Sequence, residues 1–223
     1  ILGEKAFMRN MFKVTSDTLV PRPETELLVE SIVMAAEAVG GDVKILDIGT
    51  GSGAIIVSLL DYLPQAKGVG LDISIGALTV AKENAVSIGV AERAGFLRSD
   101  VFSALPLDKK FDIIVSNPPY IPAGDIAGLA KDVQQEPIGA LDGGADGLDF
   151  YRRITKEAPL HVVEDGLLAF EIGIYQGEAV AELCRQAGFG AVAIRKDYAG
   201  IERMVFAAKE GGKYADLLLE IAK

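Results

Sequence analysis

The stretch Asp47-Ile48-Gly49-Thr50-Gly51-Ser52-Gly53-Ala54 decides the fold of this chain. It connects a short apolar segment, 44–48, to residues with helical spacing, 54–63, and so joins a predicted strand to a predicted helix. Its glycines let the backbone turn tightly and approach a ligand, and the helix start offers free N–H groups. The turn therefore favours a ligand with a carboxylate or a phosphate. The spacing also admits a dinucleotide-binding turn, and a lone glycine pattern is too weak a signal to distinguish the two kinds of ligand.

Strand and helix patterns alternate along the chain from this turn onward. The near-continuous apolar run at 111–116 is typical of a central strand that is buried on both faces. Such alternation predicts an α/β fold with a mostly parallel seven-stranded sheet, an antiparallel terminal strand and helices on both faces. Strands are predicted at 44–48, 68–71, 96–99, 111–116, 167–172, 191–195 and 203–208, and helices at 25–38, 54–63, 75–88, 150–163, 177–187 and 213–223.

Two segments lack a regular period. Residues 1–24 contain the break Pro21-Arg22-Pro23 and are predicted to form an extended or hairpin junction before a single domain, 25–223. Residues 118–148 are rich in Pro, Gly and Asp, and loops of that length inside a domain are usually functional or mobile.

The composition limits the function classes. A net charge of −10 gives no general attraction to phosphate backbones, which disfavours a nucleic-acid partner. One cysteine, Cys184, and one histidine, His161, cannot supply a disulfide framework or a two-histidine metal site, so no metal is expected. No apolar stretch reaches the roughly 20 residues of a membrane helix, and no export leader opens the sequence. We expect a monomeric cytoplasmic protein without membrane association.

Two acidic residues follow the next predicted strands. Asp72 closes the second strand, where a carboxylate can accept hydrogen bonds from both hydroxyls of a ribose. Asp100 follows the third strand and could accept from an adenine amino group. Each carboxylate could instead cap the following helix or turn, and the ligand role is favoured more clearly for Asp72.

The motif Asn117-Pro118-Pro119-Tyr120 ends the fourth strand, where open α/β sheets bind their ligands. An amide nitrogen is a weak nucleophile because its lone pair is delocalised, so positioning must promote its reaction. The Asn117 side-chain oxygen and the Pro118 carbonyl could accept both N–H bonds of a planar –NH₂ group and aim its nitrogen at a methyl sulfonium. Tyr120 could stack on that group. The alternative is an ordinary Asn-Pro turn.

The glycine turn and this motif together resemble the amino-methyltransferases, which act on exocyclic amines of adenine or on glutamine amides. Segments 19–26 (Leu-Val-Pro-Arg-Pro-Glu-Thr-Glu), 135–148 and 170–177 further resemble the release-factor glutamine methyltransferase family, PrmC or HemK. The resemblance implies a Rossmann-like class I fold, S-adenosylmethionine as methyl donor and S-adenosylhomocysteine as product. It also implies a glutamine in the catalytic loop of a peptide chain release factor as the methyl acceptor.

The resemblance also assigns individual residues. It implies that Asn117, Pro118 and Tyr120 are catalytic. Family members commonly carry an aromatic residue at the position of Val101, so Phe102 could supply adenine stacking instead. The implied cofactor-binding residues are Asp47, Gly49, Thr50, Gly51, Ser52, Gly53, Asp72, Ile73, Asp100, Val101 and Asn117. The implied substrate-binding residues are Asn117, Pro118, Pro119, Tyr120, Phe102, Arg22 and Pro23.

Three alternative functions remain open from the sequence. An adenine-N6 methyltransferase acting on DNA or RNA is the first alternative, and the acidic composition opposes it. A dehydrogenase or a non-catalytic cofactor-binding module ranks lower, because the motif 117–120 has no part in hydride transfer.

Bacterial family members carry a helical N-terminal domain, and this chain begins at a sequence that resembles the family's domain junction. We therefore expect that domain to be missing, which would affect substrate affinity more than chemistry.

Overall fold

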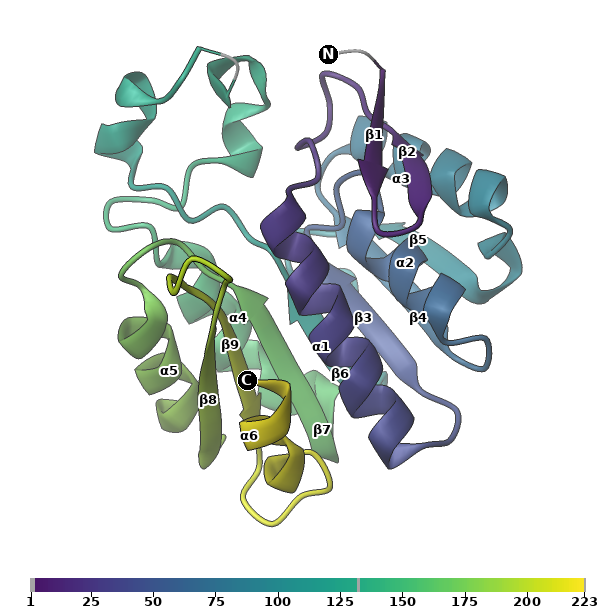
Figure 1. Cartoon of the computed structure of the whole chain (residues 1–223), viewed down its shortest axis with the longest axis vertical. Coiled ribbons are helices and arrows are strands. Elements are labelled where there is room, and N and C mark those ends of the chain that lie inside the picture. Colours follow the sequence, from purple (N-terminus) through teal and green to yellow (C-terminus); the bar gives the residue numbers. More distant parts are fainter. Residues whose placement is uncertain (1–2, 132, 223) are drawn as a thin grey trace.

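Seven strands form one sheet within residues 3–131 and 133–222, the part of the chain that the computed structural model describes (Figure 1). The strands are β3 (Lys44–Ile48), β4 (Lys67–Asp72), β5 (Ala94–Arg98), β6 (Phe111–Ser116), β7 (Val162–Glu171), β8 (Ala191–Lys196) and β9 (Glu202–Ala208). Their order is β5-β4-β3-β6-β7-β9-β8. The first five in this order pair in parallel, and β9, the last strand of the sequence, runs antiparallel to both neighbours. The predicted sheet is confirmed.

Helices cover both faces of this sheet. They are α1 (Pro23–Val39), α2 (Ala54–Tyr62), α3 (Ile75–Ile88), α4 (Asp149–His161), α5 (Gly177–Gln186) and α6 (Leu218–Ile221). In β6, Ile113 and Val115 pack in the cluster that includes α1 and α2, whereas Ile114 packs in the cluster that includes α4 and α5. Burial of each of these side chains stabilises the folded state by roughly 1.5–3 kcal/mol. The sheet is therefore a stable platform for the residues at the carboxyl ends of its strands. Among the described residues, no helix has the length and apolar character needed to cross a membrane.

The residues before α1 form a hairpin. Strands β1 (Glu4–Phe7) and β2 (Asn10–Lys13) pair antiparallel, and the rings of Phe7 and Phe12 meet edge to face at 5.8 Å within the hydrophobic cluster that includes residues of α1 and α2. Extended segments were expected here, although Ile1 and Leu2 lie outside the described residues. The division of the chain into 1–24 and 25–223 stays a prediction.

Two predicted boundaries are wrong. β7 begins at Val162 rather than at residue 167, and α4 ends at His161 rather than at residue 163. The pairing of β7 with β6 shifts between Phe111 and Ile113, so the polar segment 163–166 belongs to an irregular part of the strand without alternating apolar residues.

The predicted C-terminal helix at 213–223 is also too long. Helical structure is limited to the 3₁₀ turn η5 (Ala215–Leu217) and to α6, and Lys223 lies outside the described residues. Tyr214, Leu218 and Ile221 are buried, as their spacing indicates. The segment begins as a tighter 3₁₀ turn, a form that is common in short helical pieces.

The loop between β6 and α4 is tied to the segment before α1. Its described residues include the 3₁₀ turns η2 (Ala123–Gly128), η3 (Val133–Gln135) and η4 (Ile138–Ala140). The buried carboxylate of Glu136 accepts hydrogen bonds from Arg22 Nη2 at 2.5 Å and from the Val20 N–H at 3.3 Å. These contacts hold the two segments together at the carboxyl edge of the sheet.

Candidate active site

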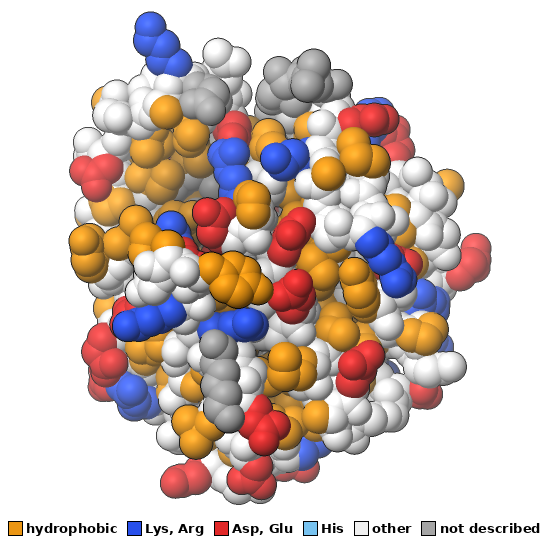
Figure 2. Space-filling view, viewed as in Figure 1, with side chains coloured by type: hydrophobic (Ala, Val, Ile, Leu, Met, Phe, Trp, Pro, Cys, Tyr) orange, Lys and Arg blue, Asp and Glu red, His pale blue; other side chains and the backbone are white. Residues whose placement is uncertain are grey.

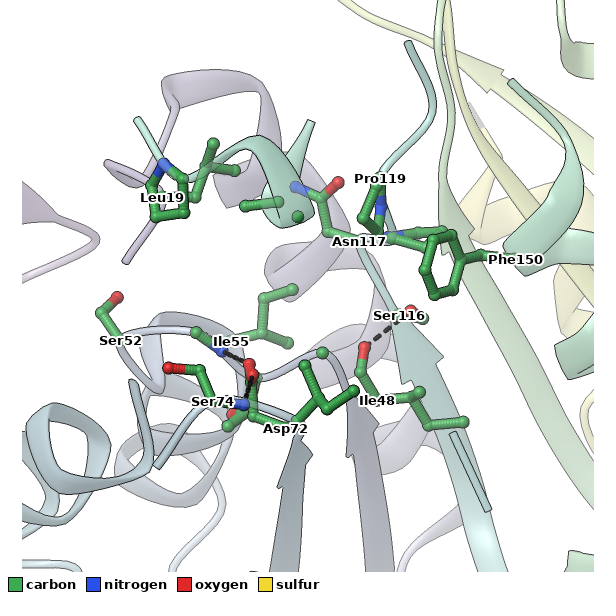
Figure 3. A pocket seen from close by; sticks show the side chains of 18 of the residues that line it. Leu19, Ile48, Ser52, Ile55, Asp72, Ser74, Ser116, Asn117, Pro119 and Phe150 are labelled. Carbon is green, nitrogen blue, oxygen red and sulfur yellow. Dashed lines mark hydrogen bonds between the residues drawn. The ribbon is translucent and has the colours of Figure 1, made fainter. Parts of the chain in front are cut away.

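A cavity of about 290 Å³ lies at the carboxyl edge of the parallel strands (Figure 3). The glycine turn and the ends of β4, β5 and β6 supply most of its floor, and the segment before α1, the loop after β6 and the start of α4 supply the rest. Asp72 and Ser74 lie on one side of it, and Asn117, Pro119 and Phe150 lie on the opposite side (Figure 3). Polar groups from distant parts of the sequence therefore face one another across a largely apolar space.

The glycine turn is held in place by β4. The N–H groups of Gly49 and Thr50 both donate to the Leu71 carbonyl at 2.8 Å. Asp72 accepts from the Gly51 N–H and from the Ser74 N–H, each at 2.9 Å, with one bond to each carboxylate oxygen. Since each oxygen has a second lone pair, Asp72 retains capacity to accept from a ligand.

Two glycines of the turn are expected to respond differently to substitution. Gly51 and Gly53 both have positive φ, 56° and 80°. A Cβ on Gly51 would meet no atom within 4 Å, whereas a Cβ on Gly53 would lie 3.1 Å from the Ala81 Cβ. We expect Gly51→Ala to cost about 1 kcal/mol through backbone strain alone, and Gly53→Ala about 2–4 kcal/mol because α3 is also displaced. Chemical denaturation of the ligand-free proteins tests this, and equal losses would contradict it.

Asp47 supports the turn from below. Its side chain is fully buried, and Oδ2 accepts from Thr50 Oγ1 at 2.7 Å. Its Oδ1 has no hydrogen-bond partner within the described part of the chain. Burial raises the pKa of this carboxyl group to about 7, against the opposing effect of the Thr50 hydrogen bond. A buried acceptor therefore lies directly behind the ligand-facing glycines.

The end of β6 positions the Asn-Pro-Pro-Tyr motif. Ser116 Oγ donates to the Ile48 carbonyl at 2.7 Å, which fixes the end of β6 against β3. Asn117 Nδ2 then donates to Thr25 Oγ1 at 3.4 Å. At the other end of the motif, the Tyr120 carbonyl accepts from Gln176 Nε2 at 3.0 Å. Both ends of the motif are therefore bonded to the surrounding fold.

Glu171, the last residue of β7, lies behind Asn117. It is buried, and its Oε2 accepts from Thr25 Oγ1 at 2.5 Å. Burial raises the pKa of Glu171 to about 7, and the Thr25 hydrogen bond opposes the rise. The site thus contains a second buried carboxyl group, one hydroxyl group away from Asn117.

The raised pKa of Glu171 is expected to make stability depend on pH. A carboxyl group whose pKa rises on folding, here from 4.5 to about 7, stabilises the folded state fully below about pH 4. That stabilisation is lost as the pH rises through about 7. We compare the free energy of unfolding of the wild type with that of Glu171→Gln. Between about pH 4 and pH 7 we expect the advantage of the wild type to fall by up to about 3 kcal/mol. Urea denaturation at stepped pH measures the difference, and a constant difference would contradict the assignment.

Comparisons of the sequence with a family model and with curated proteins identify the family of this chain. A family model described as "Methyltransferase small domain" matches residues 22–136. The release factor glutamine methyltransferase of Cereibacter sphaeroides is 47% identical to this chain, and the match covers 93% of the chain and 72% of the relative. That of Moorella thermoacetica is 45% identical, with 93% and 73% covered. The chain belongs to the release factor glutamine methyltransferase family.

The matches cover only part of the length of each relative. The match to the release factor glutamine methyltransferase of Rhodospirillum rubrum, at 45% identity, covers 94% of this chain but 63% of the relative. The chain thus spans 63% to 73% of the length of these three relatives.

Solved structures of low identity share the fold of this family member. The hMettl16 catalytic domain in complex with the MAT2A 3′UTR hairpin 1 superposes with a TM-score of 0.70 at 15% identity, covering 90% of this chain and 75% of that one. The T. thermophilus 16S rRNA methyltransferase RsmC, in complex with AdoMet and guanosine, gives 0.65 at 22% identity, covering 93% and 50%. Both support the class I methyltransferase fold.

Most residues that the sequence places in the site do line the cavity of this release factor glutamine methyltransferase family member. Asp47 and Gly53 lie behind the turn, and Pro23 and Tyr120 lie outside the cavity wall. Burial raises the pKa of Tyr120 to about 12, so its hydroxyl group stays neutral. The predicted residues on the wall are Arg22, Gly49, Thr50, Gly51, Ser52, Asp72, Ile73, Asp100, Val101, Asn117, Pro118 and Pro119.

The expectation that Phe102 stacks on adenine or binds substrate is wrong for this arrangement. Its side chain is 2% exposed and stacks on the ring of His161 at a centroid distance of 4.8 Å. The preceding residue, Val101, has a φ of 52°, and this left-handed conformation accompanies the turn of Phe102 into the core. Val101 itself lines the cavity and offers an aliphatic surface there.

Sequence interpretation missed several residues of the site. The sequence places Thr25 at the start of a predicted helix and indicates neither of its side-chain contacts, yet in the structure it lines the cavity and contacts both Asn117 and Glu171. Phe150 provides an aromatic ring beside Pro119 (Figure 3). The pair Phe150 and Ile154, four apart on α4, could have been recognised as one helix face at the end of a functional loop.

Proposed function

We propose that this chain transfers the methyl group of S-adenosylmethionine to the side-chain amide nitrogen, N5, of a glutamine in a peptide chain release factor. The observation that carries the proposal is the placement of Asn117 opposite Asp72 across one cavity (Figure 3), which Pro118 also lines. Relatives that are 45–47% identical to it are release factor glutamine methyltransferases, which supports this choice of acceptor.

The residues at the glycine turn fit S-adenosylmethionine. The backbone of Gly49 and Gly51 borders open space, since an added Cβ would meet nothing within 4 Å. Asp72 has free acceptor capacity for the ribose hydroxyls, and the start of α2 can bind the carboxylate of the methionine part. We assign cofactor binding to Gly49, Thr50, Gly51, Ser52, Asp72, Ile73, Asp100, Val101 and Asn117, with Asp47 and Gly53 in support.

The chain's own groups would then position the acceptor amide. Bound S-adenosylmethionine supplies an electrophilic methyl group. Asn117 Oδ1 and the Pro118 carbonyl accept the two N–H bonds of the glutamine amide and orient its nitrogen for attack. A C–N bond forms, the S–C bond breaks, and the nitrogen releases one proton to solvent. Alignment of this kind can supply roughly 7–11 kcal/mol of a barrier, and Pro118 and Pro119 stiffen the backbone that provides it.

The apolar wall around this centre would keep water away. Phe150 and Pro119 lie on the side of the cavity where Asn117 is located (Figure 3), and Ile154 also lines the cavity. A low-polarity surrounding strengthens hydrogen bonds to the acceptor amide. We assign substrate binding to Asn117, Pro118, Pro119, Arg22 and Phe150, and we assign Tyr120 to anchoring the motif.

The distribution of charge favours a protein acceptor over nucleic acid. On the face drawn in Figure 2, Lys and Arg side chains of the described residues alternate with Asp and Glu and form no continuous basic area. Duplex binding draws most of its affinity from such areas. We also propose that the chain acts as a monomer in the cytoplasm, where release factors function.

Parallel reactions with radiolabelled S-adenosylmethionine test the proposed acceptor class. The tubes contain a purified release factor, the same factor with its acceptor glutamine replaced, or duplex DNA. We expect label only in the unmodified release factor. Label in DNA would instead assign the chain to the adenine-N6 class.

A further inference from the structure

Glu171 is a buried carboxylate that the proposed chemistry leaves unused. Its side chain is 3% exposed, and among residues 3–131 and 133–222 it forms no salt bridge. Burying a carboxylate without a cationic partner is costly, and such groups persist where other contacts compensate. The nearest compensation is the hydroxyl group of Thr25, whose Oγ1 lies 2.5 Å from Glu171 Oε2.

Glu171 determines the donor and acceptor of each hydrogen bond in the series Glu171, Thr25 and Asn117. Thr25 Oγ1 donates to Glu171 Oε2, and a hydroxyl group has one proton, so the single hydroxyl proton of Thr25 points to Glu171. The oxygen of Thr25 is then left as an acceptor. Asn117 lies 3.4 Å from it and must present its Nδ2 group, which is the orientation in the structure. The side-chain oxygen of Asn117 consequently faces away from Thr25.

We propose that Glu171 is a positioning residue that acts through Thr25 to orient the side-chain amide of Asn117 with its oxygen available to the substrate. This inference rests on the proposed function, because only an acceptor amide with N–H groups requires an oxygen at that position. With the amide reversed, Asn117 would present N–H groups to the N–H groups of the glutamine. It would also leave the Thr25 oxygen without a donor.

The first test compares two substitutions of Thr25. Thr25→Val removes the hydroxyl group at nearly constant volume, whereas Thr25→Ser keeps it. We expect Thr25→Val to lower kcat about 10- to 100-fold with little change in the KM for S-adenosylmethionine, and Thr25→Ser to retain kcat within about threefold. Equal kcat values for the two variants would overturn the inference.

The second test reverses the bonding direction. Asn117→Asp alone places a second carboxylate against Thr25, whose proton is already donated to Glu171, and should remove nearly all turnover. Adding Glu171→Gln supplies an N–H donor to the Thr25 oxygen and frees the Thr25 proton for the new aspartate. The remaining aspartate oxygen then faces the substrate as an acceptor. We expect the double variant to recover at least about 10-fold in kcat over Asn117→Asp alone.

The controls separate the possible failures. A wild-type protein that methylates no release factor would contradict the proposed function rather than this inference. Melting temperature and S-adenosylmethionine binding, measured for every variant, identify any that fail to fold, and the Thr25 pair then decides alone. An active wild type with a folded double variant that recovers no turnover would overturn the positioning role, because a purely structural Glu171 would predict that the two losses add.

Discussion

Replacement of Asn117 by alanine is expected to reduce methyl transfer to the release factor at least about 1,000-fold, while S-adenosylmethionine binding weakens by only about 10-fold or less because the other cofactor contacts remain. The substitution removes the oxygen that accepts one N–H bond of the glutamine amide. It leaves the glycine turn and Asp72 intact on the other side of the cavity. Single-turnover kinetics and calorimetric binding measure the two quantities separately.

A matched control for this variant is Asn10→Ala. Asn10 lies in β2, outside the cavity, and its Nδ2 donates to Asp61 at 2.8 Å. The same chemical change should leave turnover within about twofold, because Asn10 does not line the cavity and its hydrogen-bond partner Asp61 does not line it either. Substantial turnover in Asn117→Ala would contradict the assignment of the amide-holding group.

Replacement of Asp72 by alanine should have the largest effect on cofactor binding. The carboxylate holds the Gly51 and Ser74 N–H groups and has acceptor capacity left for the ribose hydroxyls. Hydrogen bonds to charged groups contribute about 1.5–3 kcal/mol each, so losing two to the ligand weakens S-adenosylmethionine binding by at least about 100-fold. Isothermal titration of the purified variants measures this loss.

Asp100→Ala provides the comparison for Asp72→Ala. The side chain of Asp100 is 52% exposed and is already paired with Arg153 at 2.7 Å. Its interaction with a ligand is therefore weakened by solvent, and we expect a loss of about 10-fold or less. A larger loss for Asp100→Ala than for Asp72→Ala would reverse the roles assigned to the two carboxylates.

The parts of the site that the sequence could predict are those fixed by local order. A glycine turn after a strand, an acidic residue at the end of β4 and a motif at the end of β6 each depend on neighbours in the chain. Parallel pairing of β3, β4 and β6 then brings these three points to one edge. Local pattern and sheet geometry together were therefore sufficient to predict most of the cavity wall.

The contacts that could not be predicted join residues that are far apart in the sequence. Thr25 and Glu171 meet only because α1 packs beside β7, and neither residue has a local pattern that indicates the hydrogen bond. The prediction for Phe102 was wrong for a related reason. The turn of its ring into the core accompanies the left-handed backbone of Val101, and the amino-acid type of Val101 does not indicate that conformation.

Tandem mass spectrometry of a release factor treated with this chain and S-adenosylmethionine tests the central claim most directly. The account predicts a gain of one methyl group on the side-chain amide of a single glutamine, with no gain when Asn117→Ala replaces the wild type. A methyl group on a lysine, an arginine or the amino terminus, or an equal gain with Asn117→Ala, would contradict it.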